Sequence, residues 1–368
     1  MENKDEKEKS VLDILSEGLS EKKDFLEVPL DELPVPEGLT SSQVEATISS
    51  RSDDGLYSYK ELTERLSTQD QSSMIPTFFD QIDEMLGSEV DEKGVITKRG
   101  GLKGGELVIW SGPTKSGKST SLQAMSYLQA KNGFPTLWFS LEMSWQELTE
   151  KFKAMDKDSR ISGTSTDLPL YYPIDTRYLS LEWLEDKIKK AKEELNVCCV
   201  YIDHLHFLLS LKDNTSNVSF TIGSIVREIK RIAVRNNIPI FLICHTKKID
   251  VNTVPDINSV RDSSFVAQES DFTFIIWRVR KDINTKKKKE DYDVFADIGE
   301  DVYTNLSVIS LEANRRTGKT KKMLFGMEDG MFYPCEEYYN IVKSKGLDES
   351  WEIKKLEAYK ERLDWKNI

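Results

Sequence analysis

The sequence predicts an α/β fold in which helices cover both faces of a mostly parallel sheet. From about Met74 onward, apolar runs alternate with helical segments, which is the order expected of βαβ units. Several runs are apolar at consecutive positions, as expected for strands covered on both faces. We predict strands at Leu107–Ser111, Thr136–Ser140, Val197–Asp203, Ile238–His245, Phe272–Arg278, Leu306–Glu312, Met323–Met327 and Met331–Tyr333. The last two are short and would close the sheet as antiparallel hairpins.

One strand leads into a specific chemical motif. Gly112-Pro-Thr-Lys-Ser-Gly-Lys-Ser119 fits the phosphate-loop pattern G-x-x-x-x-G-K-[ST] and is followed by a predicted helix, residues 120–131. Its glycines let backbone N–H groups wrap phosphates, and the helix N-terminus adds positive partial charge. Lys118 is expected to reach the β- and γ-phosphates, and the Ser119 hydroxyl to bind Mg²⁺. The predicted nucleotide-binding residues are Gly112, Pro113, Thr114, Lys115, Ser116, Gly117, Lys118, Ser119 and Thr120.

Composition limits the class of protein. The 368 residues are 38% hydrophobic and 31% charged, with a formal net charge of −12, which argues against a surface coated for non-specific nucleic-acid binding but leaves room for a locally basic channel. The four cysteines show no metal-ligand or disulfide spacing, no apolar run approaches the ~20 residues that span a bilayer, and residues 1–9 lack a signal peptide's apolar stretch. We therefore expect no membrane association and a cytoplasmic protein, or a viral protein acting in the host cytoplasm.

Three regions are predicted along the chain. Residues 1–75 are an acidic extension or linker, partly disordered, in which Val28–Gly38 carries three prolines and short helices are expected near Ser42–Ser49 and Tyr59–Ser67. Residues 76–336 form the α/β domain. Residues 337–368 are rich in Glu, Lys and Tyr and are predicted to form an exposed helical tail.

Two acidic residues follow predicted strands where a nucleotide hydrolase needs them. Asp203 ends the apolar run Val200-Tyr-Ile-Asp203 and is expected to lie beside Ser119 and hold Mg²⁺. Glu142 follows a strand in Trp138-Phe-Ser-Leu-Glu-Met143, where a carboxylate can orient the attacking water as general base. Without the phosphate loop, both could be read as ordinary polar residues at strand ends.

These segments together resemble the ATPase domain of DnaB-family replicative helicases, in the RecA-like superfamily. Ser140-Leu-Glu-Met143 is similar to the family segment that carries the catalytic Glu, and Ile202-Asp-His-Leu-His-Phe207 is similar to its Ile-Asp-x-Leu-Gln motif. The latter is closest to the mitochondrial Twinkle and phage primase-helicase branch. The resemblance covers roughly residues 75–334 and implies a RecA-like phosphate-loop NTPase with ATP and Mg²⁺ as ligands.

The resemblance also implies two residues that sense the nucleotide. His245, in Leu242-Ile-Cys-His-Thr-Lys247, falls where that branch has a strand-terminal His that senses the γ-phosphate. The segment Ser259–Asp271 is similar to the family form Leu-Arg-x-Ser-x-x-x-x-Gln-x-x-Asp and places Gln268 in the second sensor position. Read from the residue alone, His245 could equally be a capped or core histidine.

An arginine supplied to the neighbouring subunit's ATP is a further implication. Glu312-Ala-Asn-Arg-Arg-Thr-Gly318 fits the place of the family form Lys-x-Arg-x-x-Gly, so that Arg315 matches the finger and Arg316 is the second choice. Ala313 stands where many relatives carry a lysine, a departure that puts in question how strongly hydrolysis depends on the neighbour. A solvated turn would also account for the two arginines.

His204 and His206 flank Leu205 directly after Asp203. They could point the same way from an extended strand, but no third metal ligand is apparent in the sequence, so a metal site is not favoured.

Loops lining a central channel hold the single strand in ring helicases of this type. The segments 210–217 and 247–261 are the candidates here, and the cations expected to bind nucleic acid are Lys212, Lys247, Lys248 and Arg261. Each could also be a solvated surface side chain. The run Lys286–Lys289 is interpreted as part of a hairpin insertion.

The function implied is an ATP-dependent helicase that assembles as a ring, as a hexamer by the resemblance, and moves single-stranded DNA during replication. A separate primase or polymerase is a possible partner. Two alternatives stay open: a RecA- or RadA-type recombination ATPase, and a nucleotide-switched scaffold ATPase that does not act on nucleic acid.

Overall fold

The computed structural model describes most of the chain after residue 73. The chain comprises two compact units, residues 1–71 and residues 72–368, and of the first unit only residues 59, 60 and 63 are described. The predicted linker and nearly all of its helices therefore lie outside the described residues. In the second unit the described residues are 74–92, 95–156, 168–176, 179–208, 218–247, 254–261, 263–280, 303–346, 353–354 and 356–357.

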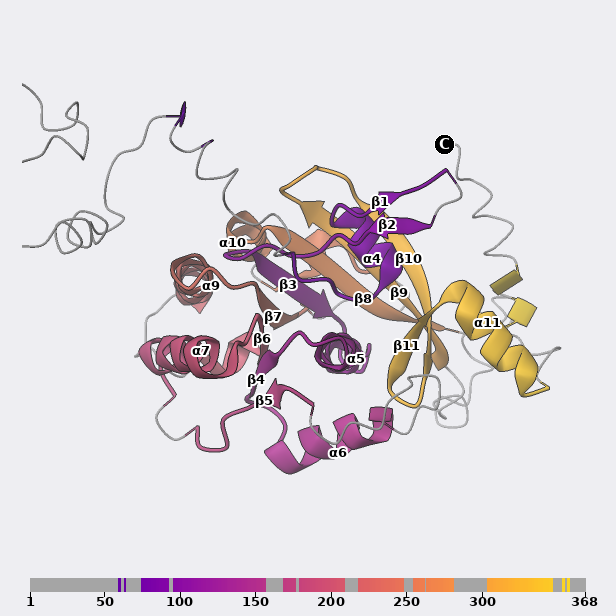
Figure 1. Cartoon of the computed structure of the whole chain (residues 1–368), viewed down its shortest axis with the longest axis horizontal. Helices are drawn as coiled ribbons and strands as arrows, with labels where there is room; N and C mark the ends of the chain where they lie inside the picture. Colours follow the sequence, from indigo (N-terminus) through magenta and orange to yellow (C-terminus); the bar gives the residue numbers. More distant parts are fainter. Residues whose placement is uncertain are drawn as a thin grey trace, which may run out of the picture. The chain divides into compact units, whose positions relative to one another are not determined.

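Among the described residues, nine strands form one sheet in the order β11-β10-β9-β8-β3-β7-β6-β4-β5 (Figure 1). The six strands from β8 to β5 are parallel, and β9, β10 and β11 continue the sheet as antiparallel neighbours. This topology confirms the fold class predicted from the sequence. The strand bounds are β3 Leu107–Gly112, β4 Thr136–Ser140, β5 Leu170–Tyr171, β6 Cys199–Asp203, β7 Ile240–His245, β8 Phe272–Arg280, β9 Tyr303–Asn314, β10 Lys321–Glu328 and β11 Met331–Pro334.

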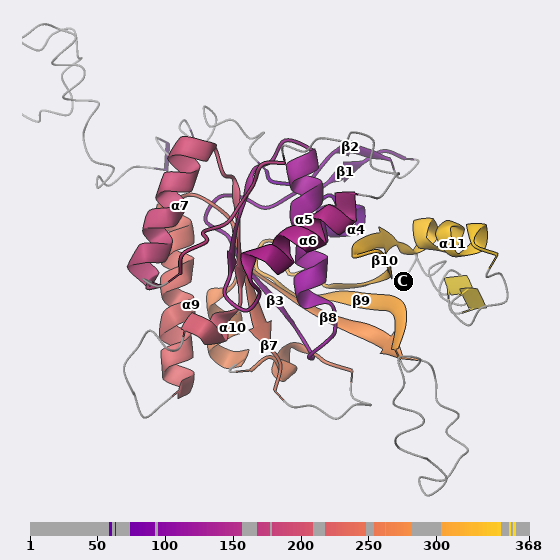
Figure 2. The ribbon, with the colours of Figure 1, turned by 90° about the horizontal axis from the view of Figure 1, so that it is seen from below.

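Helices cover the two faces of the sheet (Figure 2). One face packs on α5 (Lys118–Lys131) and α6 (Trp145–Asp156), and the other on α7 (Leu181–Leu195) and α9 (Val218–Arg235). Each face has its own buried apolar cluster, as expected for a sheet between two helical layers. The remaining elements are α4 Asp80–Met85, β1 Glu89–Val90, β2 Ile96–Lys98, α8 Leu205–Leu208, η3 Ile257–Ser259, α10 Ser263–Glu269 and α11 Cys335–Ser344.

A row of aromatic side chains crosses five neighbouring strands under α5. Trp138 and Tyr201 stack with ring centroids 4.8 Å apart, and Tyr201 stacks on Phe241 at 4.9 Å. Trp110 meets Phe241 edge-on at 6.3 Å and continues the row to Phe274 on β8. All five residues are buried, so the row fixes the spacing of the parallel strands whose ends carry the site.

Helix α5 is buried although its sequence is rich in serine and glutamine. The indole N–H of Trp110 donates to Ser121 Oγ at 3.0 Å, and that of Trp138 donates to Ser126 Oγ at 2.8 Å. Tyr201 donates its hydroxyl hydrogen to the side-chain oxygen of Gln129 at 2.6 Å. These three hydrogen bonds tie the polar face of α5 to the sheet, which fixes the helix that begins at the phosphate loop.

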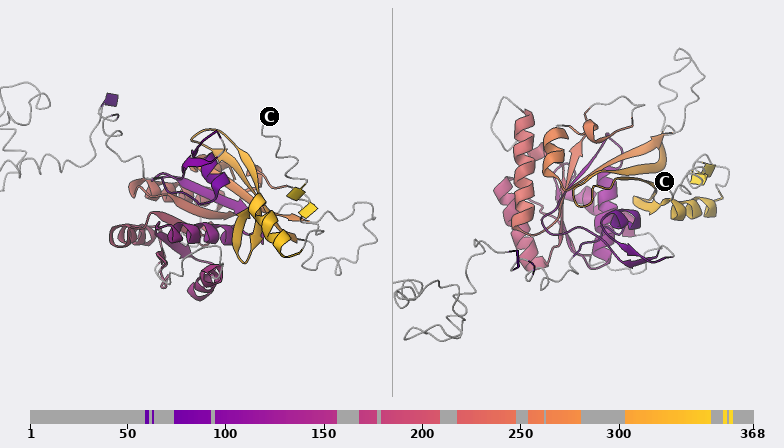
Figure 3. Two further views of the ribbon diagram at one scale, coloured as in Figure 1. Left: turned by 45° about the vertical axis from the view of Figure 1, so that its right-hand side comes forward. Right: turned by 90° about the horizontal axis from the view of Figure 1, so that it is seen from above.

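Two local expectations differ from the structure. The helix expected after residue 336 is present as α11, the yellow helix beside the last strands of the sheet (Figure 3). Tyr338 and Val342 are buried against the core and the Tyr338 ring covers Gly326 of β10, so this helix is not an exposed tail. The chain after Asp203 does not stay extended, because α8 begins at Leu205. The extended conformation considered for residues 204–206 is therefore not present.

Candidate nucleotide site

The register of the parallel strands brings the predicted chemical residues to one edge of the sheet. Gly112 on β3 pairs with His245 on β7, and Ser140 on β4 pairs with Asp203 on β6. The backbone N–H of Leu141 also donates to the carbonyl of Asp203 at 2.7 Å. Four strands therefore end at the same level, which is where ligands bind in open α/β sheets.

The phosphate loop has the backbone shape that its glycines permit. Gly117 has φ +92°, a value that favours glycine, and a Cβ on Gly112 would lie 2.1 Å from the Ile276 carbonyl oxygen. Lys118 folds back onto the loop and donates from Nζ to the carbonyls of Gly112 at 2.9 Å and Pro113 at 2.8 Å. Its ammonium is thus already held above the first turn of α5, where a phosphate anion would be stabilised.

Lys118 and Asp203 carry the electrostatic signature of a functional site. Burial lowers the pKa of Lys118 to about 8, against the opposing charges of Asp203 and Glu142. Burial likewise raises the pKa of Asp203 to about 6, while the Ser119 hydroxyl acts to lower it and the Glu142 charge raises it. Opposite shifts of this kind are typical of sites that await a charged ligand.

Buried polar atoms at this edge lack partners within the described residues. Both carboxylate oxygens of Asp203 and the hydroxyl of Ser116 are buried and make no hydrogen bond of ordinary length and angle, although the Ser119 hydroxyl lies close enough to lower the pKa of Asp203. A buried carboxylate without partners is costly, and a cation or ordered water beside it would remove that cost. The oxygen atoms of Asp203 and Ser119 are of the kind that Mg²⁺ prefers, so these residues fit the predicted metal.

Glu142 stands at the open side of the site. Its side chain is 52% exposed, and a cavity of about 350 Å³ opens beside it, lined among others by Trp145, Tyr172 and Ile174. Water can therefore reach the carboxylate, as a general base requires.

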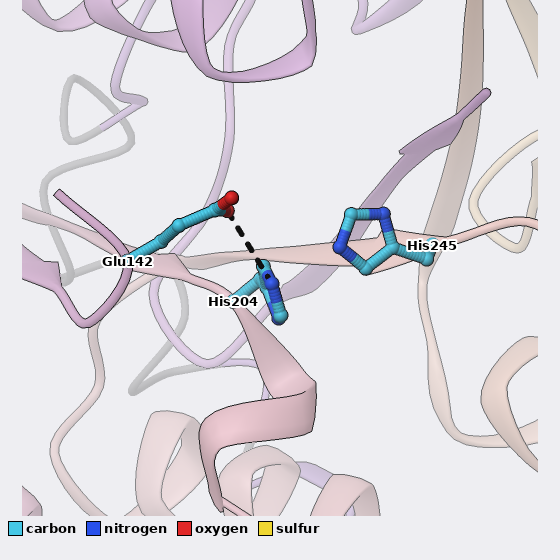
Figure 4. Close-up of side chains that lie close together, drawn as sticks. All are labelled: Glu142, His204 and His245. Atoms are coloured by element: carbon cyan, nitrogen blue, oxygen red, sulfur yellow. Dashed lines mark ion pairs between the residues drawn. The ribbon is translucent and has the colours of Figure 1, made fainter. Parts of the chain in front are cut away.

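Two histidines lie against Glu142 (Figure 4). His204 Nε2 is 3.4 Å from Glu142 Oε2, and the His204 ring meets the His245 ring edge-on with centroids 4.3 Å apart. Each of the three residues offers one ligand atom, and these atoms all lie within 4.8 Å of one another. The sequence analysis missed this grouping because it sought a partner for His204 nearby in the chain, and the other two residues come from different strand ends.

Two of the cations expected to bind nucleic acid lie beside His245. Arg261 donates its backbone N–H to the His245 carbonyl at 3.0 Å, and Lys247 donates its own to Ser259 at 2.7 Å. Both side chains are exposed. Lys212 and Lys248 lie outside the described residues, as does the run Lys286–Lys289.

Arg315 and Gln268 lie at the other edge of the sheet. The Arg315 guanidinium donates to the backbone carbonyl of Gln268 and its Nη1 is 3.9 Å from Asp271 Oδ1. Asp271 in turn accepts the backbone N–H of Leu107, the first residue of β3. Gly112 is the last residue of this six-residue strand. Arg315 and Gln268, which lie near its first residue, are therefore about 17 Å from Gly112 along the strand. The structure does not bring Arg315 or Gln268 to their own subunit's phosphate loop.

Arg316, the second choice for the finger, is used inside its own subunit. Its guanidinium makes two hydrogen bonds to the Glu106 carboxylate, at 2.7 and 2.8 Å, and others to the carbonyls of Leu86 and Gly101. It also lies over the Phe272 ring, 5.2 Å from the centroid. The Arg316 side chain is 20% exposed, whereas that of Arg315 is 55% exposed.

The fold and the phosphate-loop edge define an α/β phosphate-loop domain. The sequence profile of the DnaB-like helicase C-terminal domain matches residues 95–330, which is more than half of the chain. The protein therefore belongs to the DnaB-like helicase family, as the motifs indicated.

Known relatives agree with this assignment. The chain is 25% identical over 218 residues to a probable replicative DNA helicase of Trieres chinensis, covering 53% of this chain and 48% of that protein. It is 23% identical over 233 residues to the replicative DNA helicase DnaB of Rickettsia conorii, covering 53% and 46%. The aligned part thus spans about half the length of these relatives.

Solved structures give the same fold. One of them, described as an ATPase domain, superposes with a TM-score of 0.56 at 16% identity, covering 76% of this chain and 99% of that one. A DnaB-like replicative helicase, solved in a study of its interactions with primase, superposes with a TM-score of 0.52 at 15% identity, covering 79% and 70%. Among the described helices of the present protein, none has the length and apolar character to cross a bilayer.

Proposed function

We propose that this protein is an ATP-driven DNA helicase that assembles as a ring, with each ATP bound between two subunits. The observation that carries the proposal is the division of the hydrolytic groups between the two edges of one sheet. The phosphate loop, Glu142 and Asp203 lie at one edge, and the exposed Arg315 lies about 17 Å away at the other. A complete site then needs two copies of the chain.

ATP with Mg²⁺ is the proposed ligand. The loop N–H groups and Lys118 would bind the phosphates, and Ser119 with Asp203 would hold the metal. Bound there, Mg²⁺ neutralises charge on the β- and γ-phosphates. The buried Asp203 carboxylate, without a partner among the described residues, and the Lys118 ammonium, whose hydrogen bonds go to loop carbonyls, support this assignment.

The chain's own residues divide the chemistry of hydrolysis. Glu142, exposed to the cavity, would orient the attacking water and accept its proton. His245 ends β7 beside Gly112 and would contact the γ-phosphate through its ring. Since Arg261 and Lys247 adjoin His245, a change at the γ-phosphate could pass directly to the two described cations proposed to hold DNA.

Arg315 would act on the nucleotide of the neighbouring subunit. Its exposure supports this role, and Asp271 and Gln268 beside it would hold the guanidinium in place. Gln268 can serve a sensor role only from this same edge, and so only at the neighbour's site. When one surface of a subunit meets a different surface of the next, the assembly forms a ring if the rotation between subunits closes and a filament if it does not.

Nucleic acid, primase and polymerase remain proposed partners. The relatives named above are replicative helicases, and one solved neighbour was studied with primase, which favours replication over recombination as the setting. A cytoplasmic location is proposed on the same grounds.

The rate of ATP hydrolysis with and without single-stranded DNA tests the proposal. We expect DNA to stimulate the wild-type chain, and the Glu142→Gln variant to bind ATP with little turnover in either condition. Electron microscopy of the DNA-bound sample separates the alternatives: closed rings support the helicase, whereas filaments support a recombination ATPase. Hydrolysis that DNA leaves unchanged would favour the scaffold ATPase.

A further inference from the structure

We propose that Glu142, His204 and His245 form a binding site for Zn²⁺ that is distinct from the magnesium site. Among the described residues this is the one group of three His, Cys, Asp or Glu side chains whose ligand atoms converge, all lying within 4.8 Å of one another. The chain has three histidines in 368 residues, and two of them meet here. The inference concerns the same cleft as the proposed function, but it does not need hydrolysis to occur.

The chemistry of these ligands separates them from those of Mg²⁺. Mg²⁺ takes oxygen ligands in octahedral geometry, whereas two imidazoles and one carboxylate are a ligand set that zinc uses with water in the fourth position. Asp203 and Ser119, the oxygen ligands, are not part of the group. Zinc and magnesium would therefore select different sides of one cleft.

One of the separations between ligand atoms fits a tetrahedral ion. Two ligand atoms at about 2.0–2.1 Å from zinc lie about 3.4 Å apart at the tetrahedral angle. The separation of His204 Nε2 from Glu142 Oε2 is 3.4 Å. His245 lies further off, and one of its ring nitrogens faces the other two side chains (Figure 4). A small movement of one side chain completes the set.

The surroundings hold two of the ligands in place. The His204 side chain is only 9% exposed and packs against the His245 ring, and His245 is fixed at the end of β7. Glu142 reaches in from the open cavity, so an ion has a path from solvent. A buried imidazole, a half-buried imidazole and an accessible carboxylate therefore already lie close together before an ion arrives.

Zinc at this site would stop ATP hydrolysis. The Glu142 carboxylate, once bound to zinc, can no longer accept a proton from water, and the His245 nitrogen is withdrawn from the γ-phosphate. This consequence rests on the proposed function, whereas binding of the ion does not.

Binding is measured first, on the full nucleotide-free chain stripped of metal by a chelator. Calorimetric titration with Zn²⁺ should find about one ion per chain, and Co²⁺ should give the absorption of a tetrahedral site without a thiolate band. His204→Asn and His245→Asn should each weaken binding at least about tenfold. His206→Asn, two residues from His204, is the matched control and should bind as the wild type.

Three results would overturn the assignment. They are no zinc binding by the folded wild type, a loss of zinc affinity in His206→Asn equal to that in the other two histidine variants, or a cobalt–thiolate band that identifies cysteine ligands. Circular dichroism checks that each variant folds, and Glu142→Gln provides a third ligand change should a histidine variant unfold.

Inhibition is measured second, as ATP hydrolysis in excess Mg²⁺ over a Zn²⁺ titration. The wild type and His206→Asn should lose activity with the same midpoint, and any activity of His204→Asn should need at least about tenfold more zinc for inhibition. Equal midpoints for all three would contradict the proposed consequence. If the protein binds zinc but does not hydrolyse ATP, only the helicase proposal is contradicted. If it hydrolyses ATP but does not bind zinc, only the zinc site is contradicted.

Discussion

The two edges of the central sheet differ in how well their polar groups are satisfied. At the edge where the parallel strands end, both Asp203 oxygens are buried without partners among the described residues, and the pKa of Lys118 is lowered to about 8. At the edge where they begin, Lys230 meets Asp271 at 2.6 Å and Arg316 makes two hydrogen bonds to Glu106. Charges are paired within the subunit at one edge, whereas at the other the Asp203 carboxylate is not.

This contrast distinguishes a binding site from a structural network. Paired and hydrogen-bonded buried charges hold elements together, whereas unpartnered ones destabilise the free protein until a ligand arrives. Arg315 is the exception at the paired edge, because its side chain is 55% exposed while the adjacent Arg316 is enclosed. We therefore expect substitutions at the two arginines to have different kinds of effect.

Arg315→Ala should produce the largest loss of activity. Removal of a cation that stabilises charge on the transferring phosphate lowers hydrolysis by about 10³- to 10⁵-fold. Steady-state ATP hydrolysis of the assembled protein measures this, with the melting temperature as a check on folding. A melting temperature that falls while the rate holds would make Arg315 a structural residue.

Glu142→Gln should lower the rate of hydrolysis by about 10²- to 10⁴-fold, because the amide cannot accept a proton from water. ATP binding, followed with a fluorescent analogue, should persist. Trp145→Phe is a neighbouring control, since Trp145 lines the same cavity without an acid–base group. Hydrolysis by Glu142→Gln at the wild-type rate would exclude Glu142 as the base.

Arg316→Ala should reduce stability by about 3 kcal/mol, because it removes the cation that pairs with the Glu106 carboxylate and donates to two backbone carbonyls. Urea denaturation of the nucleotide-free chain measures the change. An unfolding free energy equal to that of the wild type, together with lost hydrolysis, would reverse the roles assigned to the two arginines.

Asp203→Asn should stabilise the nucleotide-free protein at pH 7 by about 1–3 kcal/mol. Burial raises the pKa of Asp203 from 3.8 to about 6, so the folded protein holds this proton more tightly than the unfolded chain. The contribution of the Asp203 carboxyl to the free energy of unfolding is therefore greatest below about pH 4 and falls as the pH rises to about 6.

Unfolding of the wild type and of Asp203→Asn between pH 4 and 7 measures that difference. The difference in unfolding free energy between the two proteins should increase as the pH rises and should disappear when ATP and Mg²⁺ are added. A gap that stays constant with pH would show that Asp203 has its ordinary pKa.

Sequence patterns identified the parts of the molecule that depend on local chemistry. The phosphate loop, Glu142 and Asp203 follow strands whose apolar runs are continuous, so their position at one edge followed from the parallel arrangement. Strand β4 was predicted with the observed bounds. Strands β9 and β10 extend past their apolar runs because they pair with neighbours, whereas β6 and β7 each begin two residues later than predicted.

What the sequence could not indicate depends on contacts between distant segments. Nothing local distinguishes Arg315 from Arg316, since the difference arises from Glu106 and the carbonyl of Leu86, more than 200 positions earlier. His204 likewise lacked a visible partner, because Glu142 and His245 come from other strand ends. The buried face of α11 was missed because it packs on Gly326 of β10, which has no side chain, so nothing in the sequence there indicates a contact.

The most direct test of a site shared between subunits is to mix two inactive variants. Arg315→Ala keeps an intact phosphate-loop edge, and Lys118→Ala keeps an intact arginine. An interface is complete when an Arg315→Ala subunit supplies the phosphate loop and a Lys118→Ala neighbour supplies the arginine. In a random equal mixture this occurs at about a quarter of the interfaces. The account predicts that the mixture hydrolyses ATP measurably faster than either variant alone, at equal total protein. Mixed assemblies that form, as seen by co-purification of tagged and untagged chains, yet stay as inactive as their parents would contradict it.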